Sequence, residues 1–158
     1  MNKVTIENVM SWHPCAEYTK ERITELFSGR ESLTVLDIIE LDIPAEDRLW
    51  AVLREELIPT NILHEFACRC AEEALKSIEN PDKRSIAAIE AKRKWIKGEI
   101  TKVELDAAGK AAWAAAEGAA AWAAAEGAAV LAAARAAAEG AAAGAEQIEI
   151  LKELLGVA

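Results

Sequence analysis

The sequence predicts an all-α fold, and three observations carry this prediction. The first is an Ala-rich tail over residues 107–145, because Ala is the best helix former. The second is the helical spacing of apolar residues through much of residues 11–98. The third is that no run with the two-residue period of a strand is longer than Val4–Ile6. We therefore expect a single-domain helical bundle around a central Ala-rich, Trp-anchored helix or helical hairpin.

The tail repeats every nine residues and returns a glycine, a large apolar residue and a charged residue in register. These residues are Gly109, Gly118 and Gly127; Trp113, Trp122 and Leu131; and Glu117, Glu126 and Arg135. Nine residues advance an α-helix by about 900°, so successive large residues point to opposite faces. A helix with anchors on both sides needs neighbours on both sides, which favours a central position in the bundle.

The tail begins with a capping signal, since Thr101 and Glu104 have the spacing of a capping box. A straight helix from Thr101 to Leu155 would span about 80 Å, whereas a domain of this size has a radius of gyration of about 15 Å. The helix is therefore expected to break at a glycine. Candidates are Gly118, Gly127, Gly140 and Gly144. The best turn lies between Gly140 and Gly144, followed by a closing helix over Gln147–Leu155.

Amphipathic helices are expected over residues 11–98. Their predicted ranges are Cys15–Phe27, Val35–Leu41, a helix opened by Pro44 and stopped by Pro59, Ile62–Ile78 and Asp82–Lys97. Thr34 and either Thr60 or Asn61 are expected caps, whereas Gly29 and Gly98 are expected stops. Met1–Ser11 gives no clear signal, and an extended arm is one interpretation.

The length, net charge and cysteine count of the chain limit the classes of protein to which it can belong. The chain has 158 residues, enough for one domain with a substantial core, and a formal net charge of −9. This charge disfavours binding to DNA or RNA and favours a basic partner. The tail is long enough to cross a bilayer, but its charged residues argue against a membrane span. An odd count of three cysteines and no signal-peptide run at the N-terminus lead us to expect free thiols and a cytoplasmic protein.

Cysteine and histidine side chains raise the question of a metal or a nucleophile. The candidates are His13, Cys15, His64, Cys68 and Cys70. His64 and Cys68 are four residues apart and share a helix face, but Cys68 and Cys70 point about 200° apart. No Asp or Asn is evident that would orient a Cys–His pair. We expect packing roles for these residues, with no metal site, no cofactor and no catalytic residue.

An acidic segment over Glu31–Glu56 carries eight acidic residues against two basic ones. Such a run is commonly a solvated helix face. Its functional interpretation is a docking face for a basic protein, with the acidic positions Glu40, Asp42, Glu46 and Asp47 facing the partner. Reversing those charges should then lower the association rate and its dependence on salt.

A basic helix over Asp82–Lys97 offers an alternative site. This segment contains six basic and two acidic residues. A phosphorylated nucleotide would be held by Arg84, Arg93, Lys94 and Lys97. No Gly-rich phosphate loop accompanies them. The simpler interpretation is a complement to the acidic segment, within the molecule or across a dimer. The five Trp residues are expected in the core, with Trp12 as the possible exception.

Several segments together resemble a known family. They are Trp12–Cys15, the run Ile58–Cys68, the pattern P-D-x-R…A-I-E-x-x-R-x-W-x-x-G-E within Asn80–Thr101, and the Ala/Trp repeat. Over roughly Ser11–Leu155 the chain resembles the Imm-5-like immunity proteins of bacteria and their phages. The tail departs from the pattern, since it carries Gly and Glu where more Arg and Trp are expected.

The resemblance implies a cytoplasmic, non-enzymatic protein that binds and neutralises a toxin, and it supplies no catalytic residue. Related small phage proteins act against host defence, by binding an effector protein or by sequestering a nucleotide signal. A third expectation is a structural protein that forms homo-oligomers through its Ala-rich faces. The sequence alone leaves these three functions open.

Overall fold

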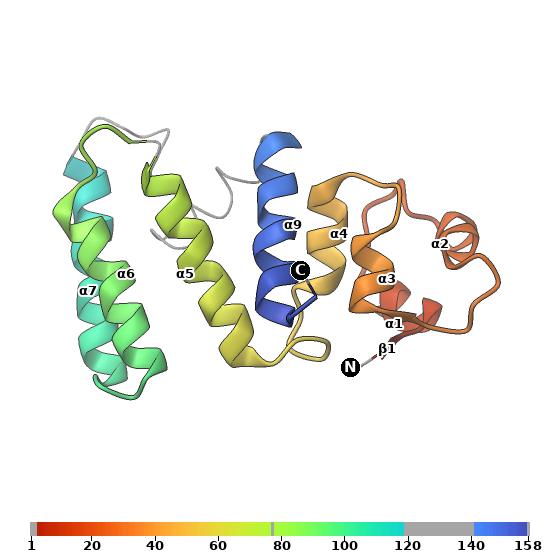
Figure 1. Ribbon diagram of the computed structural model, residues 1–158, viewed down its shortest axis with the longest axis horizontal. Coiled ribbons are helices and arrows are strands. Elements are labelled where there is room, and N and C mark those ends of the chain that lie inside the picture. The colour runs from red at the N-terminus through yellow and green to blue at the C-terminus, as the bar shows by residue number, and fades with distance from the viewer. Residues whose placement is uncertain (1–2, 77, 119–140, 158) are drawn as a thin grey trace. The chain divides into compact units, whose positions relative to one another are not determined.

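The computed structural model describes residues 3–76, 78–118 and 141–157. Most of these residues are helical, and the only strands among them form a two-stranded pair, so the all-α prediction is confirmed (Figure 1). None of the helices in these ranges has the length and apolar character that crossing a membrane requires. The chain divides into two compact units, Met1–Leu63 and His64–Ala158, which we call unit 1 and unit 2. The expectation of a single domain stays a prediction.

Unit 1 consists of short elements joined by turns. In chain order they are β1 (Lys3–Val4), α1 (Ile6–Ser11), α2 (Lys20–Phe27), β2 (Leu33–Thr34), α3 (Val35–Ile39) and α4 (Ala45–Val52). The two strands are antiparallel, with Val4 opposite Leu33. Both of these side chains are almost completely buried. This pairing ties the N-terminus to the start of α3.

Two expectations for the first 27 residues were wrong. Residues 3–11 do not form an extended arm, because α1 follows β1 with a capping box between Thr5 and Asn8. The helix expected over Cys15–Phe27 begins at Lys20 instead. The reason is Thr19, whose hydroxyl accepts a hydrogen bond from the backbone N–H of Arg22 and so fixes the first turn.

The helices α3 and α4 start where the sequence predicts but end earlier. Thr34 caps α3 as expected, and α4 begins directly after Pro44. However, α3 ends at Ile39, and α4 ends at Val52 well before Pro59. The apolar residues after α4 are buried in a turn rather than on a helix face, since the N–H groups of Leu57 and Ile58 both bond to the carbonyl of Arg54.

Longer helices form the rest of the chain. They are α5 (Thr60–Lys76), whose first four residues belong to unit 1, and α6 (Lys83–Ile96), α7 (Lys102–Gly118) and α9 (Ala141–Leu155) in unit 2. Asp82 caps α6, and Gly98 ends it with a backbone φ of +73°. The predicted capping box at the start of α7 is present, with Glu104 accepting from the N–H of Thr101 at 2.8 Å. Figure 1 shows α6 and α7 side by side as an antiparallel hairpin.

The core of unit 2 includes small side chains on α5 and α6. Cys68, Ala71 and Ile89 form a buried cluster, and Leu75 and Ile96 pack against it. Small residues at a helix interface let the two backbones approach closely. This helix pair therefore owes its packing to Cys and Ala as much as to large aliphatic residues.

The Ala-rich tail is described only in part. Its first repeat lies in α7, whereas Trp122, Leu131 and the proposed breaks at Gly127 and Gly140 lie outside the described residues. The turn expected between Gly140 and Gly144 was wrong, because α9 already begins at Ala141 and includes Gly144. The expectation of a Trp core was wrong for Trp50 and Trp113, each of which is 42% exposed.

Candidate functional site

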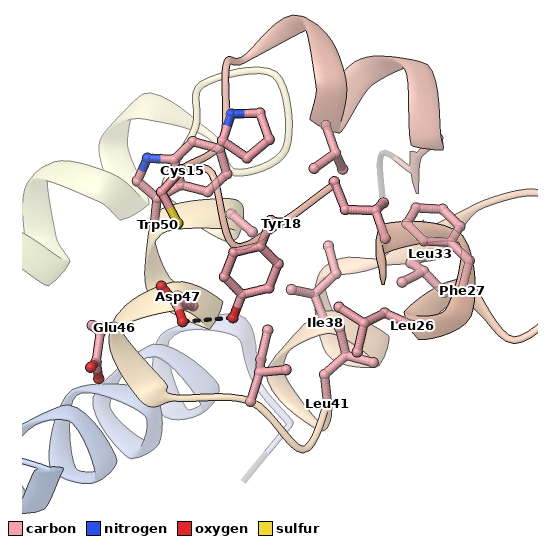
Figure 2. Close-up of a pocket in the computed structure, with 15 residues that line it drawn as sticks. Cys15, Tyr18, Leu26, Phe27, Leu33, Ile38, Leu41, Glu46, Asp47 and Trp50 are labelled. Carbon is pink, nitrogen blue, oxygen red and sulfur yellow. Dashed lines mark hydrogen bonds between the residues drawn. The ribbon is translucent and has the colours of Figure 1, made fainter. Parts of the chain in front are cut away.

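Unit 1 contains an apolar pocket of about 280 Å³ (Figure 2). Its walls come from α1, the loop of residues 12–19, α2, β2, α3 and α4. Most of the lining is hydrocarbon, from residues that include Ile23, Leu26, Phe27, Leu33, Ile38 and Leu41. The pocket exists because short helices and a loop from separate parts of the sequence meet around it.

Tyr18 is the principal polar contact of the pocket. Its hydroxyl donates a hydrogen bond to Oδ2 of Asp47 at 2.6 Å, which joins the loop of residues 12–19 to α4 (Figure 2). Burial, together with this hydrogen bond and the nearby Asp47 charge, raises the pKa of Tyr18 to about 12. Tyr18 is therefore a neutral hydrogen-bond donor at physiological pH.

Three exposed carboxylates lie on or beside the pocket, and we call Glu40, Asp42 and Glu46 the acidic rim. Glu46 itself lines the pocket, and Glu40 and Asp42 are sequence neighbours of the lining residue Leu41. In the described part of the chain, none of the three forms an ion pair with Lys or Arg. Of the four predicted partner-binding residues, Glu46 and Asp47 both line the pocket. Asp47 is half-buried, whereas the other three are exposed.

An exposed tryptophan stands at the same pocket. Trp50 lines it, and its ring packs edge-to-face against Trp12 with the centroids 6.4 Å apart. The guanidinium of Arg54 lies over both rings, at 4.1 Å from the Trp12 centroid and 4.5 Å from the Trp50 centroid. Burial lowers the pKa of Arg54, although its cation still stacks on the two faces. This stack holds the half-exposed Trp50 ring in place.

The predicted basic site has a different arrangement. Arg93 bonds to both carboxylate oxygens of Glu65 and of Glu72, so its guanidinium is committed to α5. Arg84 bonds to Asp82, the cap of its own helix. Lys94 and Lys97 are exposed, and no ion pair involves them within the described ranges. The structure does not bring four available cations together on α6.

The cysteine and histidine candidates are spread over both units. Cys68 and Cys70 are buried, and burial raises the pKa of both thiols, to about 12 for Cys70. The ring of His64 packs against Trp95 with the centroids 5.2 Å apart. Only Cys15 is exposed, and it lines the pocket. Among the described residues, no group of three or more His, Cys, Asp or Glu side chains is placed to hold a metal ion.

Sequence reasoning missed Cys15, Tyr18 and Trp50 as residues of one pocket. Cys15 and Tyr18 were assigned to a helix and Trp50 to the core. The signal that would have corrected the first assignment is Thr19, a preferred N-cap residue directly before Lys20 and Glu21. Once Thr19 starts the helix, the preceding residues become a loop. No sequence signal indicates that this loop meets α4.

Comparison with known proteins gives no match. No family model matches the chain, and no curated protein and no solved structure matches it significantly. The resemblance to the Imm-5-like immunity proteins therefore stays a prediction.

Proposed function

We propose that this chain is a non-enzymatic binding protein that neutralises a basic protein, such as a toxin or a defence effector, by occupying it stoichiometrically. The observation that carries the proposal is the acidic rim beside an apolar pocket and a half-exposed tryptophan in unit 1. Exposed carboxylates without ion pairs attract a basic partner over a distance and exclude acidic ones. An aromatic side chain next to an apolar hollow is typical of the residues that dominate binding energy.

The net charge of −9 supports the same partner class, because the whole chain adds to the field of the acidic rim. A nucleotide ligand on α6 has less support. Arg84 and Arg93 already donate to carboxylates, and a phosphate would have to displace those carboxylates first.

The test compares two triple charge reversals. One variant carries Glu40→Lys, Asp42→Lys and Glu46→Lys in the acidic rim. The matched control carries Glu79→Lys, Glu90→Lys and Glu99→Lys, three exposed positions in unit 2. Both change the net charge equally, and both leave Asp47 bonded to Tyr18.

The full chain is first used to capture its partner from a lysate of the cells that produce the chain. The association rate of the purified partner is then measured at several salt concentrations. We expect the rim variant to associate about tenfold more slowly and with a weaker salt dependence, whereas the control changes far less. Equal rates for the two variants would contradict the proposal, as would capture of a nucleotide without any protein.

A further inference from the structure

The pocket of unit 1 is large enough to hold a ligand group, not only a packing defect. Its volume is about 280 Å³. An apolar cavity of about 150 Å³ already accepts benzene. The pocket therefore has room for an aromatic ring with a short alkyl chain, or for a large aliphatic side chain with part of its neighbour.

The polar groups of the pocket select the charge of that ligand. The lining includes two acidic residues, Glu46 and Asp47, and it contains no Lys, Arg or His. Tyr18 bonds to Oδ2 of Asp47, so this carboxylate keeps lone pairs for a further donor. In the described part of the chain, no cation is paired with either carboxylate. The guanidinium groups of Arg22 and Arg54 lie over the rings of Tyr18 and Trp50, 4.9 and 4.5 Å from their centroids, but neither arginine lines the pocket. The charge of the lining itself therefore favours a cation over an anion.

We infer that this pocket binds an apolar group that carries a cation, with hydrocarbon against Leu26 and Ile38 and the cationic end at Asp47 and Glu46. The source we assign is a side chain of the protein partner, an apolar anchor with a lysine ammonium beside it. That assignment of the source rests on the proposed function, whereas the chemistry of the pocket does not. Apolar walls supply contact area, and the carboxylates supply charge-assisted hydrogen bonds.

Three probes with one skeleton separate the two requirements. They are phenylbutylamine, phenylbutanol and phenylbutyrate, which end in an ammonium, a hydroxyl and a carboxylate. The full chain is titrated with each probe, and the rate at which a thiol reagent modifies Cys15 is followed. Cys15 lines the pocket and is the exposed cysteine, whereas Cys68 and Cys70 are buried and react slowly. We expect the amine to protect Cys15 at about tenfold lower concentration than the alcohol, and the carboxylate not to protect it.

Two variants locate the binding. Ala51→Leu places a larger side chain at the pocket wall and is expected to abolish protection by the amine and by the alcohol alike. Asp47→Asn removes one charge but keeps an oxygen that accepts from Tyr18, and is expected to weaken only the amine, by about tenfold. Glu90→Gln, an exposed position on α6, is the matched control that should leave both affinities unchanged. The melting temperature of each variant shows whether it folds.

Contacts between the probe and the protein give a second readout that depends on no variant. Nuclear Overhauser effects are expected between the phenyl ring of the amine and the methyl groups of Leu26 and Ile38. Equal affinities for amine and alcohol would overturn the inference, as would ring contacts confined to α6 and α7.

The captured partner then tests the source of the group. If a partner side chain fills the pocket, the amine loses its binding once the complex has formed. An amine that binds the complex as well as the free chain would overturn this source while leaving the chemistry of the pocket in place. If the charge reversals in the acidic rim leave the association rate of the partner unchanged while the native chain binds the amine as expected, the proposed function is contradicted. The inferred chemistry of the pocket is then unaffected.

Discussion

The two units of the chain differ in the length of their helices. In unit 1 the helices α1 to α4 each have eight residues or fewer. The first three of them begin at a threonine cap. In unit 2 the helices α6, α7 and α9 have 14, 17 and 15 residues. The short elements of unit 1 meet around the apolar pocket, whereas the long helices α5 and α6 pack through a cluster that includes Cys68 and Ala71. In unit 1 the pocket thus lies where the helices are short and their connections are irregular.

Charge is distributed differently as well. The carboxylates of the acidic rim lie on the surface of unit 1 without ion pairs in the described ranges. In unit 2, Arg93 joins α6 to two glutamates of α5. The carboxylates of the acidic rim are therefore exposed to solvent, whereas the ion pairs of Arg93 hold two helices together.

The largest expected effect separates a packed core from a pocket wall. Leu151 on α9 has no exposed surface, whereas Leu26 on α2 lines the pocket and is half-buried. Leu151→Ala is expected to lower the free energy of unfolding by about 3 kcal/mol and Leu26→Ala by about 1 kcal/mol, because a side chain beside empty space loses fewer contacts. Urea denaturation measures both. Equal losses would break the distinction between the two units.

The ion pairs of Arg93 give the next effect. Arg93→Ala is expected to cost about 1–2 kcal/mol of unfolding free energy, since it removes charge-assisted hydrogen bonds to Glu65 and Glu72 that are only partly exposed. Arg84→Ala is the control on the same helix, because its pair with Asp82 is more exposed. A loss no greater than that of the control would mean that these pairs are ordinary surface contacts.

The same network predicts a dependence on acid. Hydrogen bonds from Arg93 hold the pKa of Glu72 below its ordinary value of 4.5. Because the folded-state pKa is lowered, this stabilisation is complete above pH 4.5 and is lost as the pH falls through the lower folded value. Chemical denaturation at a series of acidic pH values should show a shallower loss for Arg93→Ala than for the native chain. Parallel curves of unfolding free energy against pH for the two chains would contradict the assignment of this stabilisation to Arg93 and Glu72.

Capping should matter more to a short helix than to a long one. Thr34 caps α3, which has five residues, and Thr101 caps α7, which has 17. In both boxes the threonine hydroxyl accepts a backbone N–H, and an acidic side chain bonds back. Thr34→Ala is expected to cost about 1 kcal/mol and Thr101→Ala about 0.5 kcal/mol. Thermal unfolding followed by circular dichroism checks the order, and the reverse order would contradict it.

The smallest effect concerns Tyr18. Tyr18→Phe is expected to cost about 0.5 kcal/mol, because Asp47 regains hydrogen bonds to water when the phenol is removed. The chain has a single tyrosine, so tyrosinate absorbance reports this residue directly. We expect a titration midpoint near pH 12 rather than 10, and since the folded pKa is raised, the stabilisation is lost as the pH rises between these values. A midpoint at 10 in a chain that is still folded would show that the Tyr18–Asp47 bond is absent.

The sequence predicted those helix starts that a local signal marks, but not the starts of α2 at Lys20 and of α9 at Ala141. Thr34, Pro44, Asp82 and Thr101 act within one turn, so their signals are local and all four were confirmed. The pairing of β1 with β2 was missed because two-residue strands carry no periodic pattern. The extra turns of α9 were missed because Ala on both sides of Gly144 outweighs the cost of one glycine in a helix.

The site was predicted in the same uneven way. The acidic character of residues 40–47 follows from composition, and the structure adds the pocket beside them. That pocket depends on Tyr18 reaching Asp47 across 29 positions of sequence, which no local pattern records. The basic character of residues 83–97 likewise follows from composition, but the pairing of Arg93 with two glutamates of α5 depends on the fold and was not predicted.

Hydrogen–deuterium exchange on the full chain, alone and bound to the captured partner, tests whether the partner binds at the pocket of unit 1. We expect binding to slow exchange in the loop of residues 12–19, α3 and α4 and to leave α6 and α7 unchanged. Slower exchange confined to α6 and α7 would contradict it and would place the binding surface in unit 2.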